Sequence, residues 1–225
     1  MEVVLVRHGQ PEWGPGGRLS IDPELTPHGR LQAGRLCQRR WGAVDHLWVS
    51  PLTRARQTVE PLAPHLGMEA ETREWMAEIG PAPEWEGSPI DEIEALFARD
   101  GRHTVEEMWD GLPGAESFRD FHVRVVDGLE AALAEVGARR VDPAGAHLWH
   151  DPGEVRVVLV AHGGTNAVVL GHLLGLDPTP WEWERFDSAH TAVATLTTRP
   201  IARAAAFGMI GFGDITHLDP DMVTR

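Results

Sequence analysis

Two motifs that pair histidine with glycine stand directly after largely apolar runs that are far apart in the chain. Arg-His-Gly at residues 7–9 follows a run over 3–6, and His-Gly at 162–163 follows a run over 155–161. Short apolar runs rich in β-branched residues predict strands buried on both faces. Parallel strands of one sheet end at the same edge, which is where open α/β sheets bind ligands. An imidazole there can act as a nucleophile, and a guanidinium presents a planar fork of donors that matches phosphate.

A second arginine is predicted to reach the same edge. Arg54 stands in the first turn of a helix predicted over residues 52–66, directly after another short apolar run. With Arg7, His8 and His162 it would form a pocket for a tetrahedral dianion, to which the amide groups of helix N-termini add donors. Cationic neighbours and burial lower the pKa of a histidine, so a histidine in this pocket would be neutral, as nucleophilic attack by nitrogen requires.

The composition excludes several other partners and chemistries. The formal net charge of −14 argues against nucleic acid and against an anionic membrane surface. All 20 basic residues are arginine, so there is no lysine for a Schiff base or a P-loop. Cys37 is the single cysteine, which suits a reducing cytoplasm. No stretch has the length of a membrane span or the pattern of a signal peptide. We therefore expect a cytoplasmic protein whose partner is a small phosphorylated molecule.

Strands that alternate with helices predict a three-layer α/β/α sandwich with a mostly parallel sheet. Residues 1–225 are expected to form one domain. The predicted helices cover residues 27–40, 52–66, 117–136 and 162–174, and a further strand covers 46–49.

Two regions carry weaker periodicity. Residues 80–115 are rich in proline and glycine, with short helices predicted near 90–99 and 104–109, and we expect them to form an insertion over the site. Residues 137–154 are predicted to be loop. Edge or antiparallel strands are predicted over 181–186, 192–197 and 204–210.

Taken together, the motifs resemble those of the histidine phosphatase superfamily, the phosphoglycerate mutase-like proteins. The matches occur in the family's order and span most of residues 1–175. The strong ones are Leu-Val-Arg-His-Gly at 5–9, Leu-Thr-Pro-His-Gly at 25–29 with Gln-Ala at 32–33, Ser-Pro-Leu-Thr-Arg-Ala at 50–55 with Gln-Thr at 57–58, and Val-Ala-His-Gly-Gly at 160–164. Weaker ones are Met-Ala-Glu at 76–78 with Trp-Glu-Gly at 85–87, and Gly-Ala-Glu-Ser at 114–117 with Arg124.

The resemblance implies a catalytic role for each residue of the pocket. His8 would be the nucleophile and would carry the phosphoryl group as phosphohistidine. Arg7, Arg54 and His162, with the backbone at Gly163, would bind the phosphoryl oxygens and stabilise the charge that develops on them.

The resemblance also suggests an acid and two outer phosphate contacts. Glu78 aligns with the family's general acid, which protonates the leaving oxygen and then acts as base for water. Glu86 and Glu74 are alternatives for this role. Arg18 and Ser20 match positions that touch phosphate in relatives.

Departures from the family pattern favour hydrolysis over isomerisation. Gly14 stands where mutases carry an asparagine, and no arginine follows the glycines at 163–164 closely. We therefore expect a phosphomonoester hydrolase acting on small phosphorylated metabolites through phosphohistidine. The alternatives are a cofactor-dependent mutase-type phosphotransferase and a non-catalytic phospho-ligand binding protein.

No metal or other cofactor is expected. The histidines within 147–151 lack ligand spacing, and His162 and His172 would diverge along a helix. His190 either borders the pocket or is structural. The tryptophans at 75, 85 and 109 are typical of a core rather than of a substrate platform.

Overall fold

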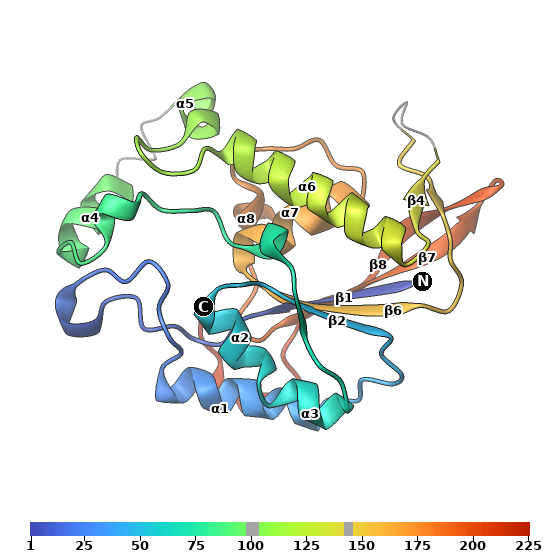
Figure 1. Cartoon of the computed structure of the whole chain (residues 1–225), viewed down its shortest axis with the longest axis horizontal. Coiled ribbons are helices and arrows are strands. Elements are labelled where there is room, and N and C mark those ends of the chain that lie inside the picture. The colour runs from blue at the N-terminus through green and yellow to red at the C-terminus, as the bar shows by residue number, and fades with distance from the viewer. Residues whose placement is uncertain (98–103, 142–145) are drawn as a thin grey trace.

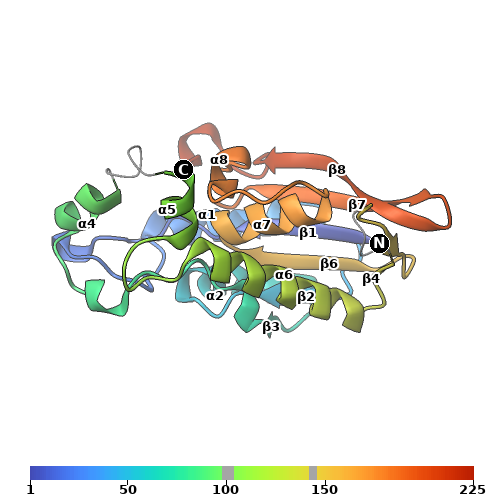
Figure 2. The ribbon, with the colours of Figure 1, turned by 90° about the horizontal axis from the view of Figure 1, so that it is seen from above.

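A mixed sheet runs through the protein with helices on both faces, as seen in the computed structural model, which describes residues 1–97, 104–141 and 146–225 (Figures 1 and 2). Its described strands follow the order β3-β2-β6-β1-β7-β8-β5-β4. Their bounds are β1 Glu2–Arg7, β2 His46–Val49, β3 Glu71–Thr72, β4 Arg139–Arg140, β5 Trp149–His150, β6 Arg156–Ala161, β7 Val193–Ile201 and β8 Ala204–Asp214.

The sheet is parallel in one half and antiparallel in the other. Strands β3, β2, β6 and β1 run parallel, whereas β7, β8, β5 and β4 each pair antiparallel with the strand before them in the sheet. The prediction of a mostly parallel sheet is therefore wrong. Only Ala202 and Arg203 separate β7 from β8, and a parallel connection needs a dozen or more residues. Ala202 adopts a φ of 53°, in keeping with a tight hairpin.

Helices cover both faces, which confirms the α/β prediction. Below the sheet in Figure 1 lie α1 (Pro27–Arg35), α2 (Thr53–Val59) and α3 (Leu62–Leu66). Above it lie α6 (Phe118–Glu135) and α7 (Gly163–Leu173). Of the helices in the described residues, none combines the length and hydrophobicity needed to cross a membrane.

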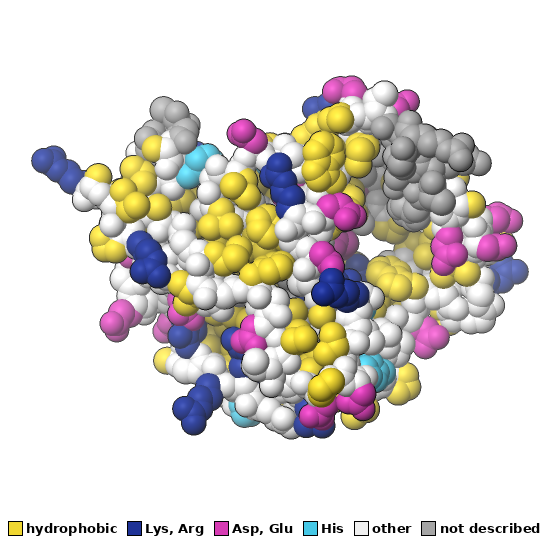
Figure 3. Space-filling model, turned by 180° about the vertical axis from the view of Figure 1, so that it is seen from behind, with side chains coloured by type: hydrophobic (Ala, Val, Ile, Leu, Met, Phe, Trp, Pro, Cys, Tyr) yellow, Lys and Arg dark blue, Asp and Glu magenta, His cyan; other side chains and the backbone are white. Residues whose placement is uncertain are grey.

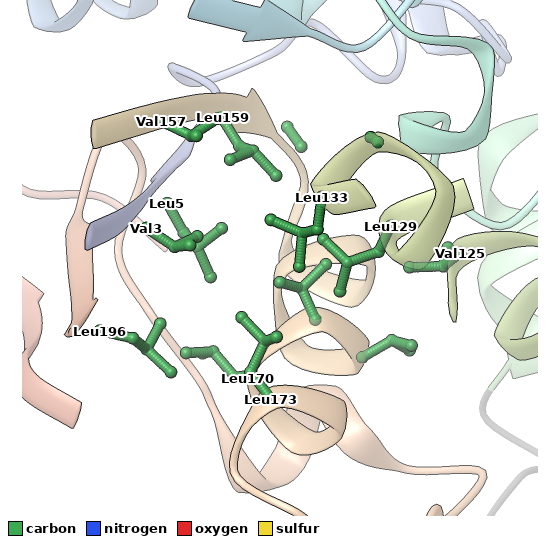
Figure 4. Close-up of a cluster of buried hydrophobic side chains, with 14 of the residues drawn as sticks. Val3, Leu5, Val125, Leu129, Leu133, Val157, Leu159, Leu170, Leu173 and Leu196 are labelled. Atoms are coloured by element: carbon green, nitrogen blue, oxygen red, sulfur yellow. The ribbon is translucent and has the colours of Figure 1, made fainter. Parts of the chain in front are cut away.

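Both faces of the central strands are buried. Alternate side chains of β1 and β6 point to opposite faces, so one set packs against α6 and α7 and the other against α2, α3 and Leu36, which follows α1. Burial on both faces explains the nearly continuous apolar runs in these strands. The first set is shown in Figure 4, with Val3, Leu5, Val157 and Leu159 from the strands facing Leu129, Leu133, Leu170 and Leu173 from the helices.

Several helix boundaries differ from the sequence prediction. The helix predicted over 52–66 is divided into α2 and α3 around Pro61, which has no N–H for an interior hydrogen bond. The helix predicted over 27–40 ends as α1 at Arg35 and continues as a 3₁₀ turn, η2 (Leu36–Gln38). The strand predicted over 181–186 is instead the short helix α8 (Glu182–Arg185). Trp183 in α8 packs against Phe118 of α6, and this tertiary contact favours the helix.

The segment expected over the site contains short helices joined by irregular chain. These are the 3₁₀ turn η4 (Pro83–Trp85), α4 (Ile90–Phe97) and α5 (Val105–Asp110). The last residues of the helix predicted over 90–99, at 98–99, lie outside the described residues. The loop predicted over 137–154 contains the short strands β4 and β5. Three other 3₁₀ turns are η1 (Pro15–Gly17), η3 (Glu74–Met76) and η6 (Pro220–Met222).

Candidate active site

Strands β1 and β6 bring two histidines together. Arg7 pairs with Ala161 in parallel register, so the strands end at the same level. His8 directly follows β1, and His162 follows β6 as the N-cap of α7. Their ring centroids lie 5.1 Å apart. Both side chains are buried, so each polar ring atom needs a partner within the protein or in a ligand.

The hydrogen bonding of His8 identifies its free nitrogen. Nδ1 lies 2.7 Å from the carbonyl oxygen of Gly9. Because a carbonyl oxygen only accepts, Nδ1 carries the hydrogen, and in the neutral ring Nε2 then holds the lone pair. Burial, together with the positive charges of Arg54 and Arg7, lowers the pKa of His8 well below its ordinary value. The ring is therefore neutral at pH 7 and presents a nucleophilic nitrogen.

The glycine of the first motif packs against backbone. A Cβ atom at Gly9 would lie 2.6 Å from the carbonyl oxygen of Gly29 in α1. The N–H of Gly9 donates to Oγ1 of Thr58 in α2 at 2.9 Å. These contacts hold Gly9, and with it the neighbouring His8, against α1 and α2. The space beside Gly9 is filled by protein atoms.

His162 is held by a serine that the sequence analysis did not single out. Nε2 of His162 lies 2.6 Å from Oγ of Ser50, which directly follows strand β2 and is fully buried. Burial and the charge of Arg54 lower the pKa of His162 well below its ordinary value. Nδ1 of the ring has no hydrogen-bond partner among the described residues. The signal that could have identified Ser50 is its place at the carboxyl end of a third parallel strand.

Both arginines keep buried donor atoms without a protein partner. Nε of Arg7, and Nε and Nη1 of Arg54, have no hydrogen bond within the described residues. Arg54 is 2% exposed and lies 4.9 Å from the ring of Trp13, and its nearest carboxylate oxygen, on Asp22, is 3.9 Å from Nη1. Arg7 donates from Nη1 to the carbonyl oxygen of Ser188. Unsatisfied buried donors are costly, so these groups indicate a site for anionic oxygen.

Glu78 is positioned by the N-terminus of α7. Its Oε2 accepts from the N–H of Gly164 at 2.8 Å, and its Oε1 accepts from the N–H of Ile79 at 3.1 Å. The other candidate acids lie elsewhere. Glu74 is exposed in η3, and Glu86 is exposed and accepts from the N–H of Ile21 at 2.9 Å. Of the three glutamates, only Glu78 lines the pocket that holds His8.

The chain segment that carries Glu78 is fixed by Arg124 of α6. Nη1 of Arg124 donates to the carbonyl oxygens of Trp75 and Ala77 at 3.0 and 3.1 Å. Its Nη2 pairs with Oε2 of Glu116 at 2.7 Å. Arg124 therefore binds other parts of the protein and positions the segment that carries Glu78.

A third histidine, His190, lies beside His8 and comes from the segment between α8 and β7. Its ring centroid lies 5.6 Å from that of His8, and its Nε2 lies 3.5 Å from Nη2 of Arg7. On the other side, its Nδ1 lies 2.8 Å from Oγ1 of Thr224. Burial and the charge of Arg7 lower the pKa of His190 to about 4. The site thus includes a neutral imidazole that packs beside His8 and is held by the C-terminal segment.

These groups converge on one cavity of about 550 Å³. Its wall includes Arg7, His8, Arg54, Glu78 and Gly163. Among the described residues, His162 and His190 do not line this cavity, and both are buried beside His8.

The two outer residues expected near phosphate are not on this wall among the described residues. Nη1 of Arg18 donates to the carbonyl oxygen of Gly87 at 2.6 Å, and the N–H of Ser20 donates to the carbonyl oxygen of Trp13 at 3.0 Å. Their contact with phosphate stays a prediction.

No group of three or more His, Cys, Asp or Glu side chains is arranged to hold a metal ion within residues 1–97, 104–141 and 146–225. His147 and His172 do approach each other, with ring centroids 6.3 Å apart. Nε2 of His172, however, pairs with Oε1 of Glu130 at 2.9 Å. Neither His172 nor Glu130 lines the cavity that contains His8.

Comparison with known proteins establishes the class. A family model of the histidine phosphatase superfamily (branch 1) matches residues 3–203, and the chain belongs to this superfamily. Phosphoserine phosphatase 1 of Hydrogenobacter thermophilus is 30% identical over 181 residues, covering 79% of this chain and 78% of that protein.

A protein of Photorhabdus laumondii named probable phosphoglycerate mutase is 28% identical over 234 residues, covering 97% of this chain and 95% of that protein. Among solved structures, a phosphoserine phosphatase variant of Entamoeba histolytica in complex with phosphoserine superposes with a TM-score of 0.67. It is 23% identical, over 96% of this chain and 98% of the other, and this likeness concerns the fold.

Proposed function

We propose that this chain is a phosphomonoester hydrolase that acts on small phosphorylated metabolites through a phosphohistidine intermediate, without a metal. The observation that carries the proposal is the surroundings of His8. Its Nδ1 is tied to Gly9, which leaves Nε2 as the nucleophile. Next to it, Arg7 and Arg54 hold buried donors that have no protein acceptor among the described residues. A phosphoryl group bound to these arginines would satisfy those donors and place phosphorus beside Nε2.

In the first step, Nε2 of His8 attacks phosphorus and the bond to the ester oxygen breaks. Glu78 supplies the proton that this oxygen needs to leave as an alcohol. Negative charge on the three remaining oxygens is stabilised by the two arginines. We assign one further donor to His162: if Oγ–H of Ser50 donates to Nε2, the hydrogen lies on Nδ1, which then donates to a phosphoryl oxygen.

In the second step, water replaces the histidine. Glu78, now ionised, takes a proton from the water as its oxygen attacks phosphorus. The bond from phosphorus to Nε2 breaks, inorganic phosphate leaves, and His8 returns to the neutral form. Glu78 ends the cycle protonated, ready for the next ester, so protons balance over the two steps.

A mutase-type phosphotransferase is the second candidate, because a relative that covers nearly the whole chain carries a phosphoglycerate mutase name. A mutase and a hydrolase share the first step and differ in what attacks the phosphohistidine. In this chain the loop after β1 carries Gly14 where the mutase pattern has an asparagine, and Trp13 beside it lines the cavity. We therefore favour water as the acceptor.

The proposal is tested by trapping the intermediate. Brief reaction with a ³²P-labelled ester and quenching in alkali should yield protein-bound phosphate that is lost in acid, as expected for phosphohistidine. H8A should trap none, and peptide mapping of the wild type should place the label on residue 8. Label retained by H8A, or normal turnover by that variant, would contradict the assignment. The exposed His65→Ala variant controls for non-specific labelling.

A further inference from the structure

Beyond the phosphoryl end, the cavity wall is dominated by aromatic and aliphatic side chains from separate segments. Trp13 comes from the loop after β1, Trp85 from η4 and Trp183 from α8. The other large apolar side chains of the wall are Ile79, Met108, Leu112, Phe118 and Phe186. Figure 3 shows a hollow in the surface at this end of the molecule, with hydrophobic, acidic and basic side chains around it.

Two of the tryptophans have surface to offer a ligand. Trp13 is 43% exposed and Trp183 is 36% exposed, although both line the cavity. Trp183 is held in place by an edge contact with Phe118, whose ring centroid lies 5.5 Å away and whose side chain is 1% exposed. A cavity of about 550 Å³ is in the range that encloses drug-sized ligands, so a phosphoryl group alone would fill only part of it.

The charges on the wall are unevenly divided. Among the described lining residues, the arginines are Arg7 and Arg54 at the phosphoryl end. Besides Glu78, which carries a proton when the ester binds in the proposed mechanism, the acidic side chains of the wall are Glu107, Glu116, Glu184 and Asp187. Two arginines outside the wall pair with members of this set, Arg124 with Glu116 and Arg225 with Asp187. A carboxylate on the leaving group would therefore be repelled, whereas an ammonium group would be attracted.

We infer that the preferred substrates are phosphate esters of alcohols with extensive apolar surface, uncharged or cationic, and that the site discriminates against leaving groups with a carboxylate. This inference rests on the proposed function and names its substrate class. It separates this chain from the solved relative in complex with phosphoserine, since phosphoserine carries a carboxylate next to the ester.

A homologous series of esters tests the inferred preference for alcohols with extensive apolar surface. Ethyl, butyl and hexyl phosphate have leaving alcohols of nearly equal basicity, so differences in kcat/KM report contact with the wall. Each methylene that becomes fully buried should raise kcat/KM by about fourfold. From ethyl to hexyl phosphate we expect a rise on the order of 10²-fold if all four methylenes are buried, and at least about tenfold if burial is partial.

Three matched six-carbon esters test the inferred discrimination against leaving groups with a carboxylate. The compounds are hexyl phosphate, 5-carboxypentyl phosphate and 6-aminohexyl phosphate. Moving either charged end out of water costs free energy of desolvation. Only the carboxylate is, in addition, repelled by the acidic side chains of the wall. The carboxylate ester should have the lowest kcat/KM, about tenfold or more below the amino ester.

Two variants connect these preferences to the wall. W183A should flatten the dependence of kcat/KM on chain length, so that the ratio of kcat/KM for hexyl phosphate over ethyl phosphate falls several-fold. E184K should raise the ratio of kcat/KM for the carboxylate ester over the amino ester several-fold. Glu60→Lys makes the same charge change at an exposed position at the end of α2 and is the control for a general charge effect.

The outcomes separate this inference from the function on which it rests. Hydrolysis of all esters with no dependence on chain length, or with the carboxylate ester preferred, would overturn the inference and leave the phosphatase intact. Failure to hydrolyse any ester, with no phosphoenzyme formed, would overturn the proposed function. A rise in kcat/KM with chain length that W183A flattens, and a preference for the amino ester that E184K weakens several-fold while Glu60→Lys does not, would support the inference.

Discussion

Oε2 of Glu78 accepts a hydrogen bond from the backbone N–H of Gly164 at 2.8 Å, which ties the proposed acid to the N-terminus of α7. The contact is close because residue 164 has no side chain. A Cβ atom there would lie 2.5 Å from Oε1 of Glu78, too near for an ordinary contact. Gly164 therefore makes room for the carboxyl group of Glu78 at the start of α7.

This relationship predicts a signature that depends on the leaving group. A general acid contributes about 10²–10⁴-fold when the leaving oxygen needs a proton, and much less when an activated aryl oxide departs. E78Q should thus slow hydrolysis of hexyl phosphate by at least about 10²-fold, with far less effect on phosphoenzyme formation from p-nitrophenyl phosphate. G164A should show the same pattern in weaker form because it displaces the carboxyl group. Equal losses on both substrates would point to a structural role, and Glu86 and Glu74 would then be tested.

Stability should fall on the acid side of neutrality. Burial and the charge of Arg7 lower the pKa of His190 to about 4, and burial and the charge of Arg39 do the same for His217. The ordinary value is about 6.5, so between about pH 6.5 and 4 the unfolded chain binds more protons than the folded one. The free energy of unfolding must then decrease as the pH falls through this window.

Urea titrations at pH 7.5 and 4.5 measure the decrease. His217 lies outside the cavity, where its Nε2 is 3.2 Å from Oγ1 of Thr191. Replacing it by glutamine keeps a polar partner and removes the proton uptake. H217Q should therefore lose less stability between the two pH values than the wild type does. Equal losses would show that this histidine is not buried in the neutral form.

Catalysis should not depend on a divalent ion. The anion-binding groups of the site are guanidinium, imidazole and backbone N–H groups. Activity should survive dialysis against EDTA, and vanadate should inhibit competitively because it adopts the five-coordinate geometry of the transferring phosphoryl group. Activity lost in chelator and restored by Mg²⁺ or Zn²⁺ would place the protein in another mechanistic class.

Water rather than a second substrate should accept the phosphoryl group. An isomerising enzyme must shield its phosphohistidine from water and hold the substrate's carboxylate, and the acidic wall around Glu184 and Asp187 does not suit a carboxylate. Incubation of 3-phosphoglycerate with a trace of 2,3-bisphosphoglycerate should give negligible 2-phosphoglycerate. In parallel, inorganic phosphate should be released from an apolar ester such as hexyl phosphate. Fast isomerisation that requires the bisphosphate would instead identify a mutase.

The order of motifs along the chain was enough to predict which side chains meet at the edge of the sheet. Arg7, His8 and His162 follow apolar runs long enough to bury a strand on both faces, and parallel register then brings their ends together. The position of Arg54 could be predicted in the same way, because Arg54 lies in the first turn of α2 and this helix starts at the edge of the sheet where β2 ends. The predicted convergence of these side chains agrees with the structure because the period of a buried strand and the start of a helix are local properties of the sequence.

Other features were decided by contacts between segments distant in the sequence. The antiparallel half of the sheet depends on β7 returning along β1, and residues 182–185 form a helix in which Trp183 contacts Phe118. The hydrogen bond between Ser50 and His162 also joins segments that are distant in the sequence. So do the packing of His190 beside His8 and the hydrogen bond between His190 and Thr224. No local pattern encodes such pairs. Their stabilising energy comes from burial and hydrogen bonds that exist only once the chain is folded, and so only the tertiary structure revealed the apolar, acidic wall of the cavity.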